Sequence, residues 1–295
     1  MLVSDETANG PSPDPRWRII YNRRLEFEAS ESFRLLRARG IEPILIKGWA
    51  VARKYPPENP RFYDDVDLAV SAEDYQEAKA VLSSPEAGKL GIDLHNELRH
   101  LDTRSWRELF DDSVVVDLHG SPVRVLSEED HLRILAVHWL SDGGIRKHRL
   151  WDIYYSLAGP TAEFSWDRCL GVVSERRQGW VIASVALAHK YLGLSIEGFP
   201  FAEKARRPPK WLTKTVEREW KWDTPYLSLH LCIYEPRELF RQVRRRLPPN
   251  PIQATINREG ELWKGSRIPY QLGNIADRAL PSLKGILHML KPRKQ

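Results

Sequence analysis

The sequence contains few cysteines and no long apolar run. Of its 295 residues only Cys169 and Cys232 are cysteines, and they lack the paired spacing of a zinc site or a disulfide framework. No stretch approaches the roughly 18 to 20 apolar residues that cross a bilayer, and the acidic, proline-rich start is unlike a secretory signal. We therefore expect a soluble, cytoplasmic protein with no transmembrane segment and two buried, reduced thiols.

The chain also lacks a strong net charge. Its 45 basic and 40 acidic residues give +5, which is too mild to mark the whole chain as a polyanion binder. The excess gathers between Arg237 and Lys294. One interpretation is a helix with a solvated basic face followed by a loose tail, which we favour; the other is a surface for nucleic acid or an acidic membrane.

The composition and pattern indicate a folded protein with two kinds of structure. With 42% hydrophobic residues and 11 tryptophans, the chain can bury a sizeable core. Helical spacing predicts helices over 17–39, 48–55 and 72–82, and short apolar runs predict strands over 44–46, 66–70 and 114–118, with 92–101 extended. Beyond residue 120 almost everything reads as helix: 127–140, 146–157, 166–176, 180–192, 211–220, 226–233 and 236–243.

These patterns predict an α+β fold with a mixed β-sheet, followed by a C-terminal α-helical domain. We place the first domain at residues 1–124, with 1–14 flexible, the helical domain at 125–248, and a basic C-terminal segment at 249–295. A ligand cleft is expected between the two domains.

Two acids on one predicted strand are the first chemical signal. Asp65 and Asp67 lie two residues apart, so both side chains project from the same face. Like charges held so close favour a divalent cation between them, and oxygen ligands favour Mg²⁺ or Mn²⁺. An acidic pair alone is weak evidence, because such pairs are often a solvated strand face.

A third acid, Asp117, stands among apolar residues of the valine-rich strand. An unpaired charge there is costly, so Asp117 needs a partner. We expect it to share a metal with Asp65 and Asp67; the alternative is an ion pair with an arginine such as Arg61 or Arg99.

The ordered set of motifs resembles a known family. Residues 45–50 (LIKGWA), Tyr55-Pro56, Arg61, Asp65-Val66-Asp67-Leu68 and Val116-Asp117-Leu118-His119 are similar to the uncharacterised bacterial nucleotidyltransferase family of the DNA polymerase β superfamily. The helical stretch from Leu135 to Asp152 adds to the resemblance, which covers residues from about 40 to 155.

The resemblance implies a polymerase-β-type nucleotidyltransferase domain that transfers a nucleoside monophosphate from an NTP and releases pyrophosphate. Asp65 and Asp67 would hold two magnesium ions on the nucleotide phosphates, and Asp117 would complete the metal site near the acceptor. Asp117 could also take the acceptor's proton, unless the metal acidifies the hydroxyl unaided.

Four residues are candidates for nucleotide binding. Gly48 would let the backbone approach the triphosphate at a helix start, although the usual Gly-Ser pair is replaced by Lys47-Gly48-Trp49. Lys47 could place a point charge on a phosphate, or strand alternation could turn it away. Arg61 is a phosphate candidate or a surface ion pair, and Arg149 reaches phosphate or pairs with Asp152 along its helix.

Histidines near the acids receive weaker assignments. His119 could orient an acceptor or hold a hydrogen bond behind the metal ligands, since alternation places it on the side of Asp117. His95 and His100, near Asp93 and Asp102, suggest a metal site, but their spacing led us to favour solvated surface.

Competing functions remain at this point. The acceptor of a nucleotidyltransferase could be an antibiotic, a sugar, a lipid, a peptide natural product or a protein, and nothing in the sequence chooses. A glycosyltransferase also uses Asp-x-Asp with manganese but explains neither Asp117 nor the early strand-glycine-helix unit, and a hydrolase lacks further ligands. The non-enzymatic alternative is a nucleotide- or nucleic-acid-binding module that uses the basic segment.

Overall fold

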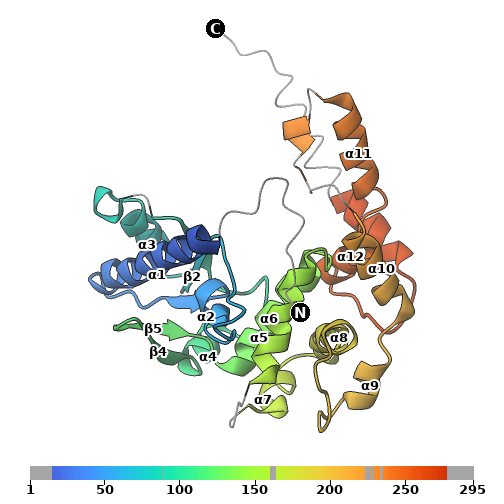
Figure 1. The fold of residues 1–295 in the computed structure, drawn as a ribbon, viewed down its shortest axis with the longest axis horizontal. Helices are drawn as coiled ribbons and strands as arrows, with labels where there is room; N and C mark the ends of the chain where they lie inside the picture. Colours follow the sequence, from blue (N-terminus) through green and yellow to red (C-terminus); the bar gives the residue numbers. More distant parts are fainter. Residues whose placement is uncertain are drawn as a thin grey trace.

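A computed structural model describes residues 15–88, 90–159, 164–222, 227, 229–232 and 235–277. The flexible segment predicted at 1–14 and the last part of the basic segment, 278–295, lie outside the described residues. Figure 1 shows a sheet covered by helices beside a second part made of helices, as expected for an α+β chain with a helical C-terminal part.

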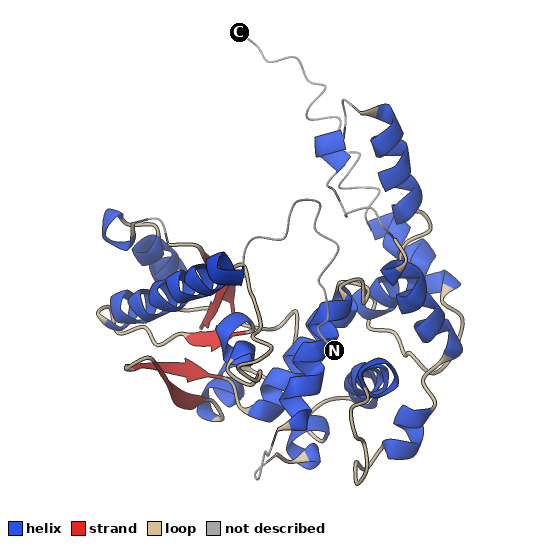
Figure 2. Ribbon diagram, in the orientation of Figure 1, coloured by secondary structure: helices blue, strands red, loops and turns tan. Residues whose placement is uncertain are grey.

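The sheet is mixed and has five strands. Its strands are β1 (Ile44–Ile46), β2 (Val66–Val70), β3 (Ile92–Asn96), β4 (Val114–Leu118) and β5 (Ser121–Val125), in the order β3-β2-β1-β5-β4 (Figure 2). The pairs β2–β3 and β1–β5 are parallel, whereas β1–β2 and β4–β5 are antiparallel. The mixed sheet confirms the predicted fold class.

Strand β5 was not predicted from the sequence. It follows β4 through His119 and Gly120, whose φ angles of 51° and 87° suit a two-residue hairpin turn. Pro122 within the strand obscured the pattern, because proline removes a backbone donor and is confined to edges, strand starts and bulges. The hairpin places Asp117 opposite Pro122, at the far edge of the sheet.

The two faces of the sheet pack against different helices. Helices α1 (Pro15–Arg37) and α3 (Tyr75–Leu82) cover one face, where Leu45, Leu68 and Val125 join their core. On the other face Ile44, Ile46 and Ala69 belong to the same core as α5 (Glu128–Ser141). The sheet and the helical part therefore share apolar packing, which fixes their relative position.

The remaining α-helices are α2 (Gly48–Ala52), α4 (Trp106–Asp111), α6 (Leu150–Ala158), α7 (Trp166–Leu170), α8 (Glu175–Leu192), α9 (Ala202–Arg206), α10 (Lys210–Trp220), α11 (Pro236–Arg246) and α12 (Pro251–Asn257). Four of them pack against α5 or α8, which are buried on most sides: α6, α7, α9 and α12. The helix predicted over 166–176 ends at Leu170 instead, because Ser174 caps α8 by accepting a hydrogen bond from the Arg177 N–H. Within the described residues, no helix is both long and apolar enough to span a bilayer.

A buried arginine ties the sheet part to the helices. The Arg133 side chain in α5 is 2% exposed; its Nε donates to Asp102 Oδ2 at 2.8 Å, and it also pairs with Asp130. Its Nη1 donates to the backbone oxygen of Cys169 in α7 at 3.1 Å. One guanidinium therefore joins the segment after β3, α5 and α7.

Replacing Arg133 with leucine should destabilise the protein by about 3 to 5 kcal/mol, because two buried carboxylates lose a partner. Urea unfolding measures the change. The control is Arg107→Leu, since the Arg107 side chain is 90% exposed and lies 3.7 Å from Asp111. Equal stability losses in the two variants would contradict this role for Arg133.

Candidate active site

The acidic pair lies where the loop after α2 enters β2. Asp65 immediately precedes the strand and is exposed, whereas Asp67 lies within it and is buried. Asp67 Oδ1 accepts hydrogen bonds from Lys47 Nζ at 2.8 Å and from His95 Nε2 at 2.9 Å. Burial alone would raise the pKa of Asp67, but His95 and Lys47 outweigh it and lower the pKa. The pKa of Asp65 is raised by burial and by the charge of Asp67.

A second pair, Asp93 and His95, stands on the neighbouring strand β3. The parallel register places Asp93 opposite Asp67 and His95 opposite Ala69, so all four side chains leave the same face. His95 Nε2 lies 3.4 Å from Asp93 Oδ2, and one ligand atom each from Asp67, Asp93 and His95 lie within 4.8 Å of one another. The solvated surface expected for His95 is therefore wrong: the two-residue spacing of Asp93 and His95, the same as that of Asp65 and Asp67, indicates that both side chains share one strand face.

Asp117 is not brought to this cluster. Three strand spacings separate β2 from β4, which amounts to about 14 Å. Its carboxylate accepts from the Gly120 N–H at 3.0 and 3.1 Å and so caps the hairpin turn. The expectation that Asp117 shares an ion with Asp65 and Asp67 is therefore wrong, because β4 pairs with β5 and not with β2.

His119 also lies away from the acidic pair. It sits in the β4–β5 turn, where its Nε2 lies 3.0 Å from Glu26 Oε2 of α1 and contacts Arg23. The structure thus places His119 between the hairpin and α1 rather than beside a metal or an acceptor.

Lys47 and Gly48 form the sharp turn between β1 and α2. Lys47 has a left-handed backbone with φ 51°, and its N–H donates to Nε2 of the buried His131 at 3.1 Å. Burial, with Lys54 and Arg53, lowers the pKa of His131 to about 3, so the ring is neutral and can accept. A Cβ on Gly48 would lie 3.3 Å from the Asp65 carbonyl oxygen, which explains the glycine by close packing. Its approach to phosphate stays a prediction.

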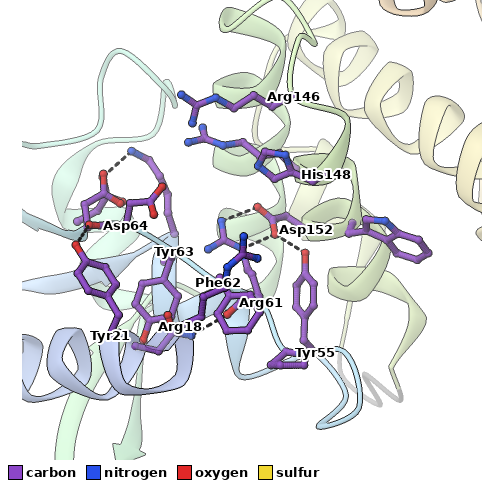
Figure 3. A pocket seen from close by; sticks show the side chains of 18 of the residues that line it. Arg18, Tyr21, Tyr55, Arg61, Phe62, Tyr63, Asp64, Arg146, His148 and Asp152 are labelled. Carbon is purple, nitrogen blue, oxygen red and sulfur yellow. Dashed lines mark hydrogen bonds and ion pairs between the residues drawn. The ribbon is translucent and has the colours of Figure 1, made fainter. Parts of the chain in front are cut away.

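Arg61 is paired across the two parts of the chain. Its Nε and Nη2 donate to the two oxygens of Asp152 in α6 at 2.6 and 2.9 Å, and Tyr55 Oη donates to Asp152 at 2.6 Å (Figure 3). Burial would raise the pKa of Asp152, but Arg61 and Tyr55 outweigh it and lower the pKa. Asp152 thus forms its ion pair with Arg61. The helical pair Arg149–Asp152, considered from the sequence, is absent from the contacts of the described residues.

Arg149 lies beside the cleft with other partners. Its Nη1 lies 3.1 Å from His138 Nδ1 and 3.2 Å from Asp142 Oδ2. Burial and the neighbouring Arg146 lower the pKa of Arg149, and burial with Lys47 and Arg149 lowers the pKa of His138 to about 3. A neutral His138 can accept a hydrogen bond from the Arg149 guanidinium at Nδ1.

Asp65, Asp67 and Asp93 line one cleft of about 1140 Å³ between the sheet and the helices, and Arg61 and Arg149 line it with them. Figure 3 shows Tyr21, Tyr63 and Asp64 on one side and Arg146 and His148 on the other. An acidic floor, formed by Asp65, Asp67 and Asp93, therefore faces a cationic wall, formed by Arg146 and Arg149. Trp17, Ile20 and Tyr21 of α1, with Phe62 of the loop before β2, supply an apolar edge. The cleft expected between the two parts is present.

Comparisons with known proteins identify the family. A family described as "Uncharacterised nucleotidyltransferase" matches residues 16–193, more than half of the chain. The chain belongs to this nucleotidyltransferase family. No curated protein matches it. Among solved structures, an antigenic nucleotidyltransferase-like protein from Paracoccidioides brasiliensis is similar, with 14% identity, a TM-score of 0.43, and coverage of 62% of this chain and 92% of that chain.

Helices beyond the family match contact the turn that precedes the cationic wall of this family member. Gly143 and Gly144 have φ of 79° and 67°, and a Cβ on Gly143 would lie 2.7 Å from Asn250 Nδ2 of the segment before α12. Asn250 Nδ2 donates to the Gly143 carbonyl at 3.1 Å, and Trp220 Nε1 donates to that of Gly144 at 2.9 Å. These contacts fix the turn that leads into Arg146 and Arg149.

Replacing Asp152 with asparagine should destabilise the nucleotidyltransferase by about 3 kcal/mol or more at pH 7, because Arg61 stays buried without a counter-charge. The folded-state pKa of Asp152 is lowered, so its contribution is present above about pH 4 and is lost as the pH falls through the folded pKa. The stability difference from the parent should therefore be constant above about pH 5 and shrink below about pH 4.

Urea unfolding across this pH range measures both parts. The matched control is Asp111→Asn, whose carboxylate is 65% exposed and 3.7 Å from Arg107. A stability gap that does not narrow in acid would show that the Asp152 charge is not the cause.

Proposed function

We propose that this member of the nucleotidyltransferase family transfers a nucleoside monophosphate from an NTP to an acceptor, using a divalent cation held by Asp65, Asp67 and Asp93. The observation that carries the proposal is the register of β2 and β3, which sets Asp67 against Asp93 at the floor of a cleft with a cationic wall. Asp93 would therefore have the role of third metal ligand that was predicted for Asp117.

The residues fit a hard divalent cation. Burial and the charge of Asp67 raise the pKa of Asp65, so a cation beside the two carboxylates would relieve a real electrostatic cost. Carboxylate oxygens with one imidazole nearby suit Mg²⁺ or Mn²⁺. The chemistry supplied by such a cation is neutralisation of charge on the phosphate oxygens. His95 Nε2 donates a hydrogen bond to Asp67 Oδ1 at 2.9 Å and so orients the Asp67 carboxylate.

The cationic wall suits the triphosphate. Arg146 and Arg149 line the cleft opposite the acids, and Arg61 keeps one buried Nη1 without a partner among the described residues. Guanidinium groups donate paired hydrogen bonds to phosphate oxygens. The nucleotide phosphates would therefore lie between the acidic floor and the arginines.

The transfer itself uses groups at the floor. The acceptor oxygen bonds to the α-phosphorus, the bond from that phosphorus to the bridging oxygen of the β-phosphate breaks, and pyrophosphate leaves. Asp93, whose side chain is 59% exposed, would take the acceptor's proton at a carboxylate oxygen. This deprotonation would create the attacking oxygen beside the nucleotide.

The cleft is large enough for two substrates. Its volume of about 1140 Å³ exceeds the usual range for one ligand, about 300 to 1000 Å³. The apolar edge at Trp17, Ile20, Tyr21 and Phe62 suits an acceptor with an apolar part, such as a small molecule or a peptide natural product. Nucleic acid is the less favoured partner, because α11, which carries Arg244, Arg245 and Arg246 in the described part of the basic region, lies away from the sheet (Figure 1).

Substituting Asp67 or Asp93 with asparagine should lower transfer at least about a hundredfold, whereas Asp117→Asn should retain activity near that of the parent. The assay incubates the protein with each α-labelled NTP, Mg²⁺ or Mn²⁺ and a cell extract, and follows label in the acceptor fraction. The structural reason is that Asp117 caps a turn at the opposite edge of the sheet.

A result with Asp117→Asn inactive and Asp93→Asn active would overturn the assignment of Asp93. Circular dichroism of each variant checks that the fold is retained. Absence of label transfer with every NTP and with both metals, for the parent protein in several extracts, would count against nucleotidyl transfer itself.

Replacing Arg149 with methionine should weaken binding of a non-hydrolysable NTP about tenfold or more, because a charged hydrogen-bond donor to phosphate is lost. Binding of the nucleoside without phosphates should change little. Isothermal titration calorimetry measures both affinities. The control is Arg176→Met on the exposed face of α8, and equal losses in both variants would place the triphosphate elsewhere.

A further inference from the structure

Lys47 places a positive charge inside the acidic cluster. Its ammonium is 2.8 Å from Asp67 Oδ1, and the two side chains are 11% and 5% exposed. The same oxygen contacts His95 Nε2 at 2.9 Å. A lysine therefore occupies part of the space in which a cation bound to Asp67 would sit.

The backbone directs Lys47 to this position. A left-handed φ of 51° is uncommon outside glycine, and the Lys47 N–H is fixed by the buried His131 at 3.1 Å. The ordinary alternation of β1 stops at Ile46, so the side chain is aimed by the turn and not by the strand. A strained residue held by a buried partner keeps its geometry only where the surroundings enforce it.

A divalent cation and this ammonium would oppose one another. If both contacted Asp67, charges of +2 and +1 would lie roughly 5 Å apart in a partly buried site, where their repulsion is strong. Lysine has a flexible stem and three donors, so its head group can move while its backbone stays fixed. Lys47 lines the same cleft as Arg149, so phosphates bound in that cleft could receive the ammonium.

We propose that Lys47 acts as a counter-cation: its ammonium neutralises Asp67 while no metal is bound, and the side chain moves to contact a nucleotide phosphate when the metal cation binds. The proposal rests on the proposed metal-dependent function and adds to it a specific exchange of charges. This exchange would make the affinity for the metal weak in the absence of nucleotide. Binding of the metal and binding of the NTP would therefore be coupled. The lysine thus takes over the phosphate contact that a serine would make after the glycine.

The test measures Mn²⁺ affinity in the absence of nucleotide, by the electron paramagnetic resonance signal of free Mn²⁺. Lys47→Met, which keeps the length of the side chain and removes its charge, should bind Mn²⁺ at least about tenfold more tightly than the parent. The matched control is Lys54→Met. The Lys54 side chain is 13% exposed, and its Nζ lies 2.7 Å from Glu128 Oε1, not beside Asp65, Asp67 or Asp93. It should bind Mn²⁺ as the parent does, and Asp67→Asn should bind it far more weakly.

The outcomes separate this proposal from the proposed function. Unchanged or weaker Mn²⁺ binding by Lys47→Met, with Asp67→Asn impaired, would overturn the exchange and leave the metal site intact. No Mn²⁺ binding by the parent or by Lys47→Met, and no effect of Asp67→Asn, would overturn both. Lys47→Met should also bind a non-hydrolysable NTP more weakly, which a purely structural lysine would not require.

A second measurement uses the parent protein and avoids any failure of the variant to fold. Reductive methylation followed by mass spectrometry reports how accessible the Lys47 amine is. Methylation of Lys47 should be slow without metal, accelerate with Mn²⁺ alone, and slow again with Mn²⁺ and a non-hydrolysable NTP. A rate that Mn²⁺ leaves unchanged would overturn the proposal.

Discussion

The parallel pairing of β2 with β3 holds Asp67 opposite Asp93, and the other features of the site respond to that concentration of negative charge. A slip of one residue would turn Asp93 to the opposite face, where α1 and α3 pack. With the register as it stands, two carboxylates and Asp65 share a half-buried floor. His95, Lys47 and the arginines across the cleft are the groups that make such a floor stable.

The acidic pair could be predicted from the sequence because strand alternation is a local property. Asp65 and Asp67 lie two residues apart, and nothing beyond the chain around them decides which way they face. The third acid depends on strand order, which is a long-range property. Asp117 lies in a valine-rich run that is easily recognised as a strand, but β5 separates that strand from β1. Asp93 lies on the less apolar strand β3, which pairs directly with β2.

The arginines show the same division between local and long-range information. Arg61 and Arg149 were both expected near phosphate, and both line the cleft. Their partners could not be predicted from spacing: Asp152 pairs with Arg61, far away in the sequence, rather than with Arg149 three residues before it. Arg61 therefore mainly joins the two parts of the chain, with one buried nitrogen, Nη1, unpaired among the described residues, whereas Arg149 belongs to the cationic wall with Arg146.

The helices after residue 193 have a role in this arrangement although they lie beyond the family match. The wall residues Arg146 and Arg149 follow a Gly143–Gly144 turn, and glycines alone would leave that turn free to move. Asn250 and Trp220 hold its carbonyls, and Trp139 donates to the carbonyl of Arg146 at 3.0 Å. These distant helices therefore contribute to the cleft by fixing the turn that carries Arg146 and Arg149 rather than by lining it.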